Sequence, residues 1–202
     1  MKSKIFELLY RLLIITFAIL GLCLNNPYGN GMQFWFFTSQ TNAFVVIIET
    51  IICVLIIINI CGKETHLAKN NVFSLIRLMI TFFITITGII YMFVLAPTGI
   101  AFAEKSASYM FNFRNIILHA IVPVMSIIGY YAFANSGMMN KNHAWYFLIY
   151  PFIYFVLAIF RVEFGGKPFY DGTLYPYFFI DPTIGGQGWG MVAIYVVVII
   201  VL

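Results

Sequence analysis

The chain has 202 residues, of which 62% are hydrophobic and only 9% are charged. Soluble domains average about 25% charged residues, so the composition excludes an ordinary soluble protein and predicts an integral membrane protein. The net charge of +4 is spread over the ends of apolar segments, with no basic cluster that would indicate nucleic-acid binding. Spans of about 20 residues leave room for a single transmembrane domain over residues 1–202.

Six apolar segments predict an all-α fold, a polytopic bundle of six transmembrane helices. The expected helices are Ile5–Leu24, Phe34–Ile60, Val72–Leu95, Arg114–Phe133, Ala144–Phe160 and Met191–Leu202. Pro97 and Gly99 are expected to end the third helix, because proline cannot continue the helical hydrogen bonds. The last segment rises only about 18 Å, against a membrane core of about 30 Å. It is therefore expected either to begin earlier, near Gln187, or to continue beyond the last residue.

The distribution of Lys and Arg predicts that both termini are cytoplasmic. With the N-terminus inside, seven of these residues lie at inner helix ends and four at outer ends. Positive residues favour the cytoplasmic side, so this count selects the orientation. The N-terminal Met1–Lys4 before an apolar run is similar to a signal peptide, but no small-residue cleavage site follows, which indicates a retained first span.

Cysteine and glycine patterns give no sign of a metal or cofactor site. Cys23, Cys53 and Cys61 form no CxxC pair, so neither a disulfide framework nor a zinc site is expected. The glycines at 185–188 lack the Lys-Ser/Thr partner of a phosphate-binding loop and are expected to form a hinge. We therefore predict no metal and no cofactor.

His119 is the most informative polar residue of the fourth span. An ionisable side chain within a membrane helix indicates a functional site by default. Pro123 lies four residues later, where its ring crowds the His119 carbonyl and provides no N–H for it. A carbonyl freed in this way must find a partner inside the protein, so this face is expected to point into the bundle. The alternative is an interhelical histidine beside a packing kink.

The second span carries a polar stripe formed by Thr38, Asn42 and Glu49. At about 100° per residue, the three side chains fall within about 40° of one another and should face the interior. Thr38 and Asn42 also suit hydrogen bonding between helices. A carboxyl at mid-membrane is expected to be protonated or hydrogen-bonded within the bundle, so Glu49→Gln should be nearly neutral for folding and Glu49→Lys severely disruptive.

Thr38 and His119 are expected at the same depth. Each lies roughly 6–8 Å below the outer end of its helix at 1.5 Å per residue. A hydroxyl and an imidazole at matching depth on inward faces can form a nucleophile and base pair.

An aromatic segment in the last long loop, Tyr175–Asp181, has the sequence YPYFFID. Tyrosines commonly anchor at the membrane interface. The alternative is a cap that folds back over the outer end of the bundle, from which Asp181 would hydrogen-bond to a histidine or to helix N-terminal amides. Insertion of a flexible tag after Tyr177 should then impair activity or stability.

Three segments together resemble a known family. Residues 36–42 (FFTSQTN), 118–123 (LHAIVP) and 175–181 (YPYFFID) are similar, in order and spacing, to the bacterial six-helix Pr6Pr membrane proteins. That family in turn resembles the eukaryotic androgen-induced and androgen-dependent membrane hydrolases. The resemblance implies a six-span enzyme of the bacterial inner membrane that cleaves esters of fatty acids.

The resemblance also implies roles for individual residues. Thr38 matches the intramembrane threonine nucleophile and His119 its histidine, while Ser39 and Thr41 crowd the same turn and stay open as nucleophiles. Asn42, Glu49, Tyr175 and Asp181 are the expected oxyanion or substrate-binding residues. The expected partner is a lipid or fatty-acyl ester within the membrane.

Two other function classes stay open. One is a transporter or ligand-binding bundle in which Glu49 and His119 bind a proton or a small solute, although no paired halves are visible. The other is a membrane scaffold without catalysis.

Overall fold

The computed structural model describes residues 2–25, 31–63, 65–67, 70–102, 106–133, 141–169, 172–186 and 188–201. Over these ranges the chain is helical and contains no strand, in agreement with the predicted all-α fold. It divides into two compact units, Met1–Asn140 and Lys141–Leu202, each of which is described by itself.

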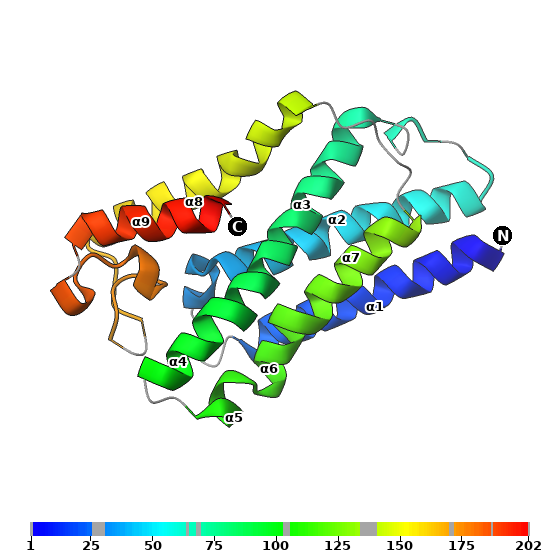
Figure 1. Ribbon diagram of the computed structural model, residues 1–202. Helices are drawn as coiled ribbons and strands as arrows, with labels where there is room; N and C mark the ends of the chain where they lie inside the picture. Colours follow the sequence, from blue (N-terminus) through cyan, green and yellow to red (C-terminus); the bar gives the residue numbers. More distant parts are fainter. Residues whose placement is uncertain are drawn as a thin grey trace. The chain divides into compact units, whose positions relative to one another are not determined.

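Four long helical runs form the first unit (Figure 1). They are α1 (Lys2–Leu24), α2 (Phe37–Ile60), α3 (Asn71–Ile90) continued by α4 (Ala96–Phe102), and α6 (Phe113–Ile116) continued by α7 (Val122–Phe133). A short helix α5 (Ala107–Met110) joins α4 to α6. Helix α1 packs on α2, α2 on α3, α3 on α7 and α7 back on α1, so the four runs enclose one core.

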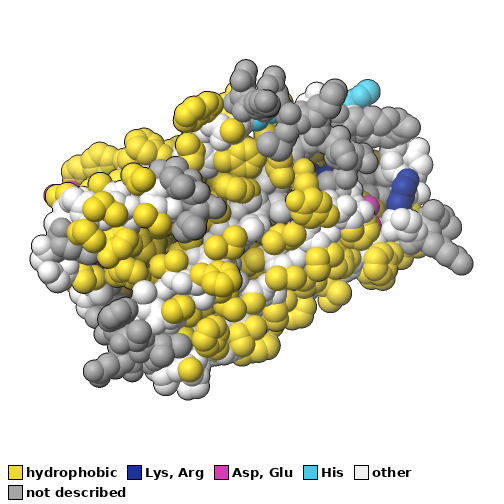
Figure 2. Space-filling model, viewed as in Figure 1, with side chains coloured by type: hydrophobic (Ala, Val, Ile, Leu, Met, Phe, Trp, Pro, Cys, Tyr) yellow, Lys and Arg dark blue, Asp and Glu magenta, His cyan; other side chains and the backbone are white. Residues whose placement is uncertain are grey.

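The core of this bundle is mainly aliphatic, and large apolar side chains also cover its outside. One buried cluster is Ile14, Ala18, Val45, Ile84, Ile117 and Val122, and a second is Ile48, Ile52, Ile56 and Phe73. Figure 2 shows hydrophobic side chains over most of the described surface on the face drawn. An outer surface of this kind suits lipid, because water would penalise an apolar patch of this extent.

Within the described residues, five helical segments are long and apolar enough to cross a membrane. They are Ser3–Leu24, Phe37–Ile60, Asn71–Gly99, Phe113–Phe133 and His143–Glu163. These segments confirm the prediction of a multi-pass membrane protein. The sixth predicted span corresponds to α9 (Gly188–Val201), a shorter helix of 14 residues that begins earlier than Met191.

The third helical run does not end at Pro97, and this prediction was wrong. Residues Tyr91–Leu95 form a π-helical turn, and α4 continues through the proline to Phe102. The N–H of Ala96 donates to the Tyr91 carbonyl, one residue further back than in an α-helix. The absent N–H of Pro97 therefore falls where the helical register changes, so the wider turn accommodates the proline without ending the helix.

The second unit contains α8 (Tyr146–Glu163) and α9, joined by a long segment whose described residues include two short 3-10 turns, Phe178–Ile180 and Ile184–Gly186. Arg161, near the end of α8, is buried and donates to the carbonyls of Leu174 and Lys167, and its guanidinium stacks 4.2 Å from the Phe169 ring centre. The sequence indicated only a charge at an outer helix end. Its bonds instead fold the start of the segment onto α8.

Candidate active site

Thr38 and His119 meet inside the first unit. Thr38 lies in the first turn of α2, and His119 lies in a π-helical turn, Ile117–Ile121, between α6 and α7. The Thr38 Oγ1 and the His119 Nε2 are 3.2 Å apart, and both side chains are buried. The structure thus brings together the hydroxyl and the imidazole that matching depth suggested, although 81 positions separate them in the chain.

The hydrogen bond at Nδ1 determines which ring nitrogen of His119 carries the proton. His119 Nδ1 lies 2.9 Å from the backbone carbonyl of Asn115. A carbonyl can only accept, so in the neutral ring Nδ1 carries the hydrogen and Nε2 presents its lone pair. Nε2 therefore accepts from the Thr38 hydroxyl, which is the arrangement that a general base requires.

Two residues of the third helical run pack against His119, one against its ring and one against its backbone. The Tyr91 ring stacks on the His119 ring, with centres 3.7 Å apart and planes inclined by 20°. The Tyr91 hydroxyl donates to the carbonyl of Met110, which fixes the ring. Gly88 lies one turn earlier, and a Cβ there would come within 2.9 Å of the His119 carbonyl oxygen. Neither contact was predicted from the sequence, because Gly88 and Tyr91 lie on a different helix from His119.

Pro123 affects a second carbonyl besides the expected one of His119. The N–H of Val122 donates to the Ile117 carbonyl, in the π-helical register. The Leu118 carbonyl therefore loses its α-helical donor, and its π-helical donor would be Pro123, which has no N–H. The expected loss of the Pro123 donor at the His119 carbonyl is therefore accompanied by the loss of a donor at the neighbouring Leu118 carbonyl.

Asn42 supplies the missing partner. Its Nδ2 donates to the Leu118 carbonyl at 3.3 Å and to the Thr38 carbonyl at 2.9 Å. Asn42 thereby ties the turn that carries the nucleophile candidate to the turn that carries His119. Because both amide hydrogens are engaged, this conformation does not supply the free donor that the expected oxyanion role requires. The Asn42 Oδ1 is buried and has no partner among the described residues.

The two alternative hydroxyls of this turn point elsewhere. Ser39 is fully buried and accepts from Asn25 Nδ2 at 3.4 Å. The Thr41 hydroxyl contacts the Thr38 carbonyl at 3.1 Å and the Thr87 hydroxyl at 2.9 Å. Of the three hydroxyls, the structure places that of Thr38 against the imidazole.

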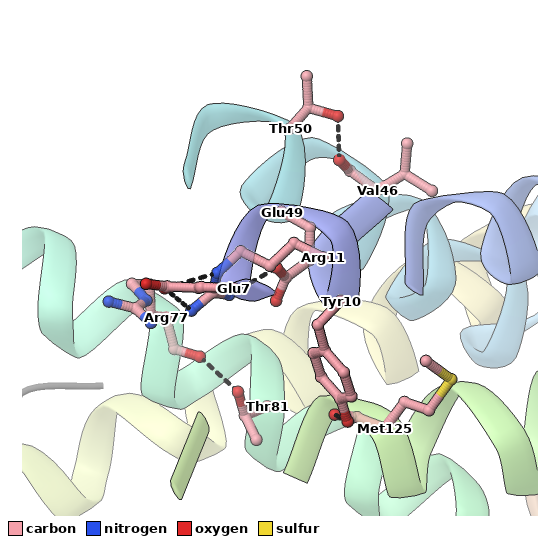
Figure 3. Close-up of polar contacts among 9 residues, drawn as sticks. All are labelled: Glu7, Tyr10, Arg11, Val46, Glu49, Thr50, Arg77, Thr81 and Met125. Carbon is pink, nitrogen blue, oxygen red and sulfur yellow. Dashed lines mark hydrogen bonds and ion pairs between the residues drawn. The ribbon is translucent and has the colours of Figure 1, made fainter. Parts of the chain in front are cut away.

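Glu49 belongs to a separate polar cluster (Figure 3). Its Oε2 accepts from Arg11 Nη1 at 2.6 Å, and Arg11 also donates from Nε and Nη2 to Glu7 Oε1 at 2.9 and 2.8 Å. The prediction that Glu49 is hydrogen-bonded within the bundle is confirmed. Eleven residues after Thr38, it lies about 16 Å further along α2, so it does not contact the Thr38–His119 pair.

Tyr175 and Asp181 lie in the second unit, where both are buried. Asp181 Oδ1 accepts from the backbone N–H of Thr183 at 2.8 Å and from its hydroxyl at 2.6 Å. Burial raises the pKa of the Tyr175 phenol, and the nearby Glu163 and Asp181 carboxylates raise it further. The cap over the bundle stays a prediction. Asp181 was expected to orient a histidine by a hydrogen bond. At His119 Nδ1 that bond is made by the Asn115 carbonyl.

The start of α2 favours negative charge near Thr38. The N-cap position is Phe36, which makes no side-chain capping bond. A helix N-terminus carries a partial positive charge, and this end is close to the Thr38 hydroxyl. A developing oxyanion on a group attacked by Thr38 would therefore experience a favourable dipole.

No protein-family model matches the chain, and neither a curated protein nor a solved structure matches it. Among the described residues, no three His, Cys, Asp or Glu side chains gather in a way that could hold a metal ion. The functional interpretation therefore rests on the geometry of the Thr38–His119 pair.

Proposed function

We propose that the chain is an intramembrane hydrolase of fatty-acyl esters, with Thr38 as nucleophile and His119 as general base. The observation that carries this proposal is the 3.2 Å contact between Thr38 Oγ1 and His119 Nε2, with the opposite ring nitrogen bonded to a carbonyl. A hydroxyl, a base and a group that orients the base form the arrangement on which nucleophilic acyl transfer depends.

The reaction proceeds in two stages. Thr38 Oγ1 bonds to the ester carbonyl carbon while its proton passes to His119 Nε2. The bond to the alcohol oxygen then breaks, and that oxygen takes the proton from Nε2 as the alcohol leaves. In the second stage, water gives a proton to Nε2 and bonds to the acyl carbon. The acyl bond to Thr38 breaks, Thr38 regains the proton, and the carboxylic acid departs.

The membrane setting explains the substrate class. A long acyl chain partitions into the hydrocarbon region and reaches the bundle laterally, with its ester group near the polar boundary. In the proposed topology six spans cross a bacterial inner membrane with both termini in the cytoplasm, so the start of α2 is near the outer leaflet. Water for the second stage then comes from the outer surface.

The central experiment combines covalent labelling with ester turnover in detergent or vesicles. A lipid-like fluorophosphonate should label the wild-type chain, and Thr38→Ala and His119→Ala should each abolish labelling and hydrolysis of a long-chain ester. Ser39→Ala and Thr41→Val are matched controls in the same turn and should keep labelling. Retained hydrolysis in both Thr38→Ala and His119→Ala would eliminate the pair, and a binding or transport function would then lead.

Single-cysteine accessibility tests the proposed topology. The natural Cys23, Cys53 and Cys61 would first be replaced, and one cysteine would be placed at Lys141 or Asp171. Both positions lie outside the residues whose side chains the structure describes. Position 171 should label from the outer side and position 141 from the cytoplasm. Labelling of position 171 only from the cytoplasm would invert the topology.

A further inference from the structure

The turn between α5 and α6 carries a set of asparagine hydrogen bonds beside the base of the proposed site. Helix α5 ends at Met110 and α6 begins at Phe113, so two residues separate them (Figure 1). His119 Nδ1 bonds to the backbone carbonyl of Asn115, which belongs to α6. The direction of that carbonyl, and with it the orientation of the imidazole, therefore depends on how α6 is held.

Helix α6 is the first turn of the fourth helical run, where backbone N–H groups lack partners within the helix. Asn112 is its N-cap, and its Oδ1 accepts from the Asn115 N–H at 3.0 Å. The Nδ2 of the same side chain donates to the Tyr109 carbonyl at 2.7 Å. Asn112 thereby fastens the first turn of α6 to the end of α5.

The Asn115 side chain makes a second link between the two helices. Its Nδ2 donates to the Met110 carbonyl at 2.9 Å and lies 3.4 Å from the Tyr109 carbonyl. The Met110 carbonyl also accepts from the Tyr91 hydroxyl, and the Tyr91 ring stacks on the imidazole. One carbonyl thus anchors both the residue that bonds to the edge of the His119 ring and the residue that covers its face.

We propose, on the basis of the proposed function, that Asn115 is a positioning residue whose side-chain amide keeps His119 in its Nδ1–H tautomer. The amide fixes the direction of the Asn115 carbonyl, and that carbonyl holds the hydrogen on Nδ1. A neutral histidine has two tautomers, and the hydrogen bond at one ring nitrogen selects between them. A released imidazole would carry its hydrogen on Nε2 for part of the time, and Nε2 could not then accept the proton of Thr38.

Nitrogen NMR of the full chain in detergent, with isotopically labelled histidine, tests the tautomer directly. The chain contains three histidines, and His119→Gln identifies the signals of His119. At a pH where all of them are neutral, wild-type His119 should give a protonated signal for Nδ1 and an unprotonated signal for Nε2. Asn115→Leu keeps the size and branching of the side chain without its amide, and should shift both signals towards the average of two tautomers.

The kinetic expectation for Asn115→Leu follows from the same release. Its kcat for a long-chain ester should fall by roughly tenfold to 100-fold, as for other misplaced catalytic groups. KM should change little, because the base acts in the chemical step and not in substrate binding. If Asn115→Leu does not fold, Asn115→Ala replaces it with the same expectations.

Asn70→Ala is the matched control for losing the bonds of an asparagine side chain. Asn70 caps α3 in the same unit, where its Oδ1 accepts from the N–H groups of Val72 and Phe73 at 2.8 and 3.2 Å. This variant should lower the unfolding midpoint, because a capping bond is lost, and should keep the wild-type tautomer and kcat.

The NMR and kinetic results separate the positioning role from the proposed function. A single tautomer in Asn115→Leu would overturn the positioning role and leave the hydrolase intact, as would an unchanged kcat. Two tautomers of His119 in the wild type would also overturn it. A single wild-type tautomer that is lost in Asn115→Leu, in a chain without any ester turnover, would support the hold of Asn115 on His119 and count against the hydrolase.

Discussion

The first unit buries polar groups in two places and in two different ways. Near the start of α2, neutral groups satisfy one another, since His119 and Asn42 bond to backbone carbonyls and Thr38 bonds to the imidazole. Deeper in the bundle, opposite charges satisfy one another, since Arg11 bonds to both Glu7 and Glu49. The two regions face the same low-dielectric environment.

The difference has a chemical consequence. A neutral hydroxyl and a neutral imidazole can be buried at modest cost, and charge arises between them only while a reaction proceeds. A buried ion pair is held together by a strong attraction that offsets an equally large desolvation penalty. The neutral site can therefore exchange partners, whereas the charged cluster fixes how α1 packs on α2. Substitutions should separate the two regions, with large stability effects in the charged cluster and large activity effects in the neutral site.

The largest expected loss of stability follows Arg11→Met. This change leaves Glu49 buried at mid-membrane without its partner, which should lower the free energy of unfolding by about 3–5 kcal/mol. The revised expectation for Glu49→Gln is a clear loss as well, because Arg11 then loses one of its two carboxylates. Thermal unfolding in detergent measures both.

The double variant Arg11→Met/Glu49→Met provides the control. With both charges replaced by apolar side chains, it should be more stable than Arg11→Met alone. Ester turnover of the folded fraction should match the wild type in all of these variants. A double variant that is no more stable than Arg11→Met would show that the pair is not coupled as the structure indicates.

Asn42→Leu should lower both the free energy of unfolding and the ester turnover. The Leu118 carbonyl is left unpaired, which should lower the free energy of unfolding by about 1–3 kcal/mol, whereas the Thr38 carbonyl keeps the bond from the Thr41 hydroxyl. Turnover should also fall, because the link between the turns of Thr38 and His119 is removed. Unchanged turnover with lowered stability would restrict Asn42 to a structural role.

Gly88→Ala should disturb the site at moderate cost to stability. The new Cβ would meet the His119 carbonyl oxygen at 2.9 Å, and overpacking of this kind costs about 1–3 kcal/mol. Turnover should fall because the His119 backbone must move. Gly129→Ala, whose Cβ would meet the Tyr10 ring at 3.0 Å and Ile14 Cδ1 at 3.5 Å, is the matched control and should keep turnover.

The smallest effect on stability is expected for Tyr91→Phe. It removes the hydrogen bond to the Met110 carbonyl, worth about 0.5–1.5 kcal/mol net, and keeps the ring against His119. Tyr91→Leu removes the stacking and should lower kcat with little change in KM, since the imidazole loses its fixed plane. Equal kcat values for the two variants would show that stacking does not position His119.

Composition and local periodicity were enough to predict the class of protein. A chain so poor in charge can only be stable in lipid, and five of the predicted spans correspond to helices that are long and apolar enough to cross a membrane. The inward stripe of α2 was also predictable, because side chains four or seven residues apart share a helix face whatever the helix packs against. Thr38, Asn42 and Glu49 are all buried as expected.

Only the tertiary structure decided which of these inward residues meet. Residues on one face of α2 divide between two clusters because α1 brings Arg11 to Glu49 while the fourth run brings His119 to Thr38. Arg11 counted as a cytoplasmic charge in the sequence, yet it is 1% exposed. The π-helical register of the turn that carries His119 leaves the Leu118 carbonyl without a helical donor as well, and this register depends on neighbouring helices. Local patterns fix which way a side chain faces, but helix packing fixes what it touches.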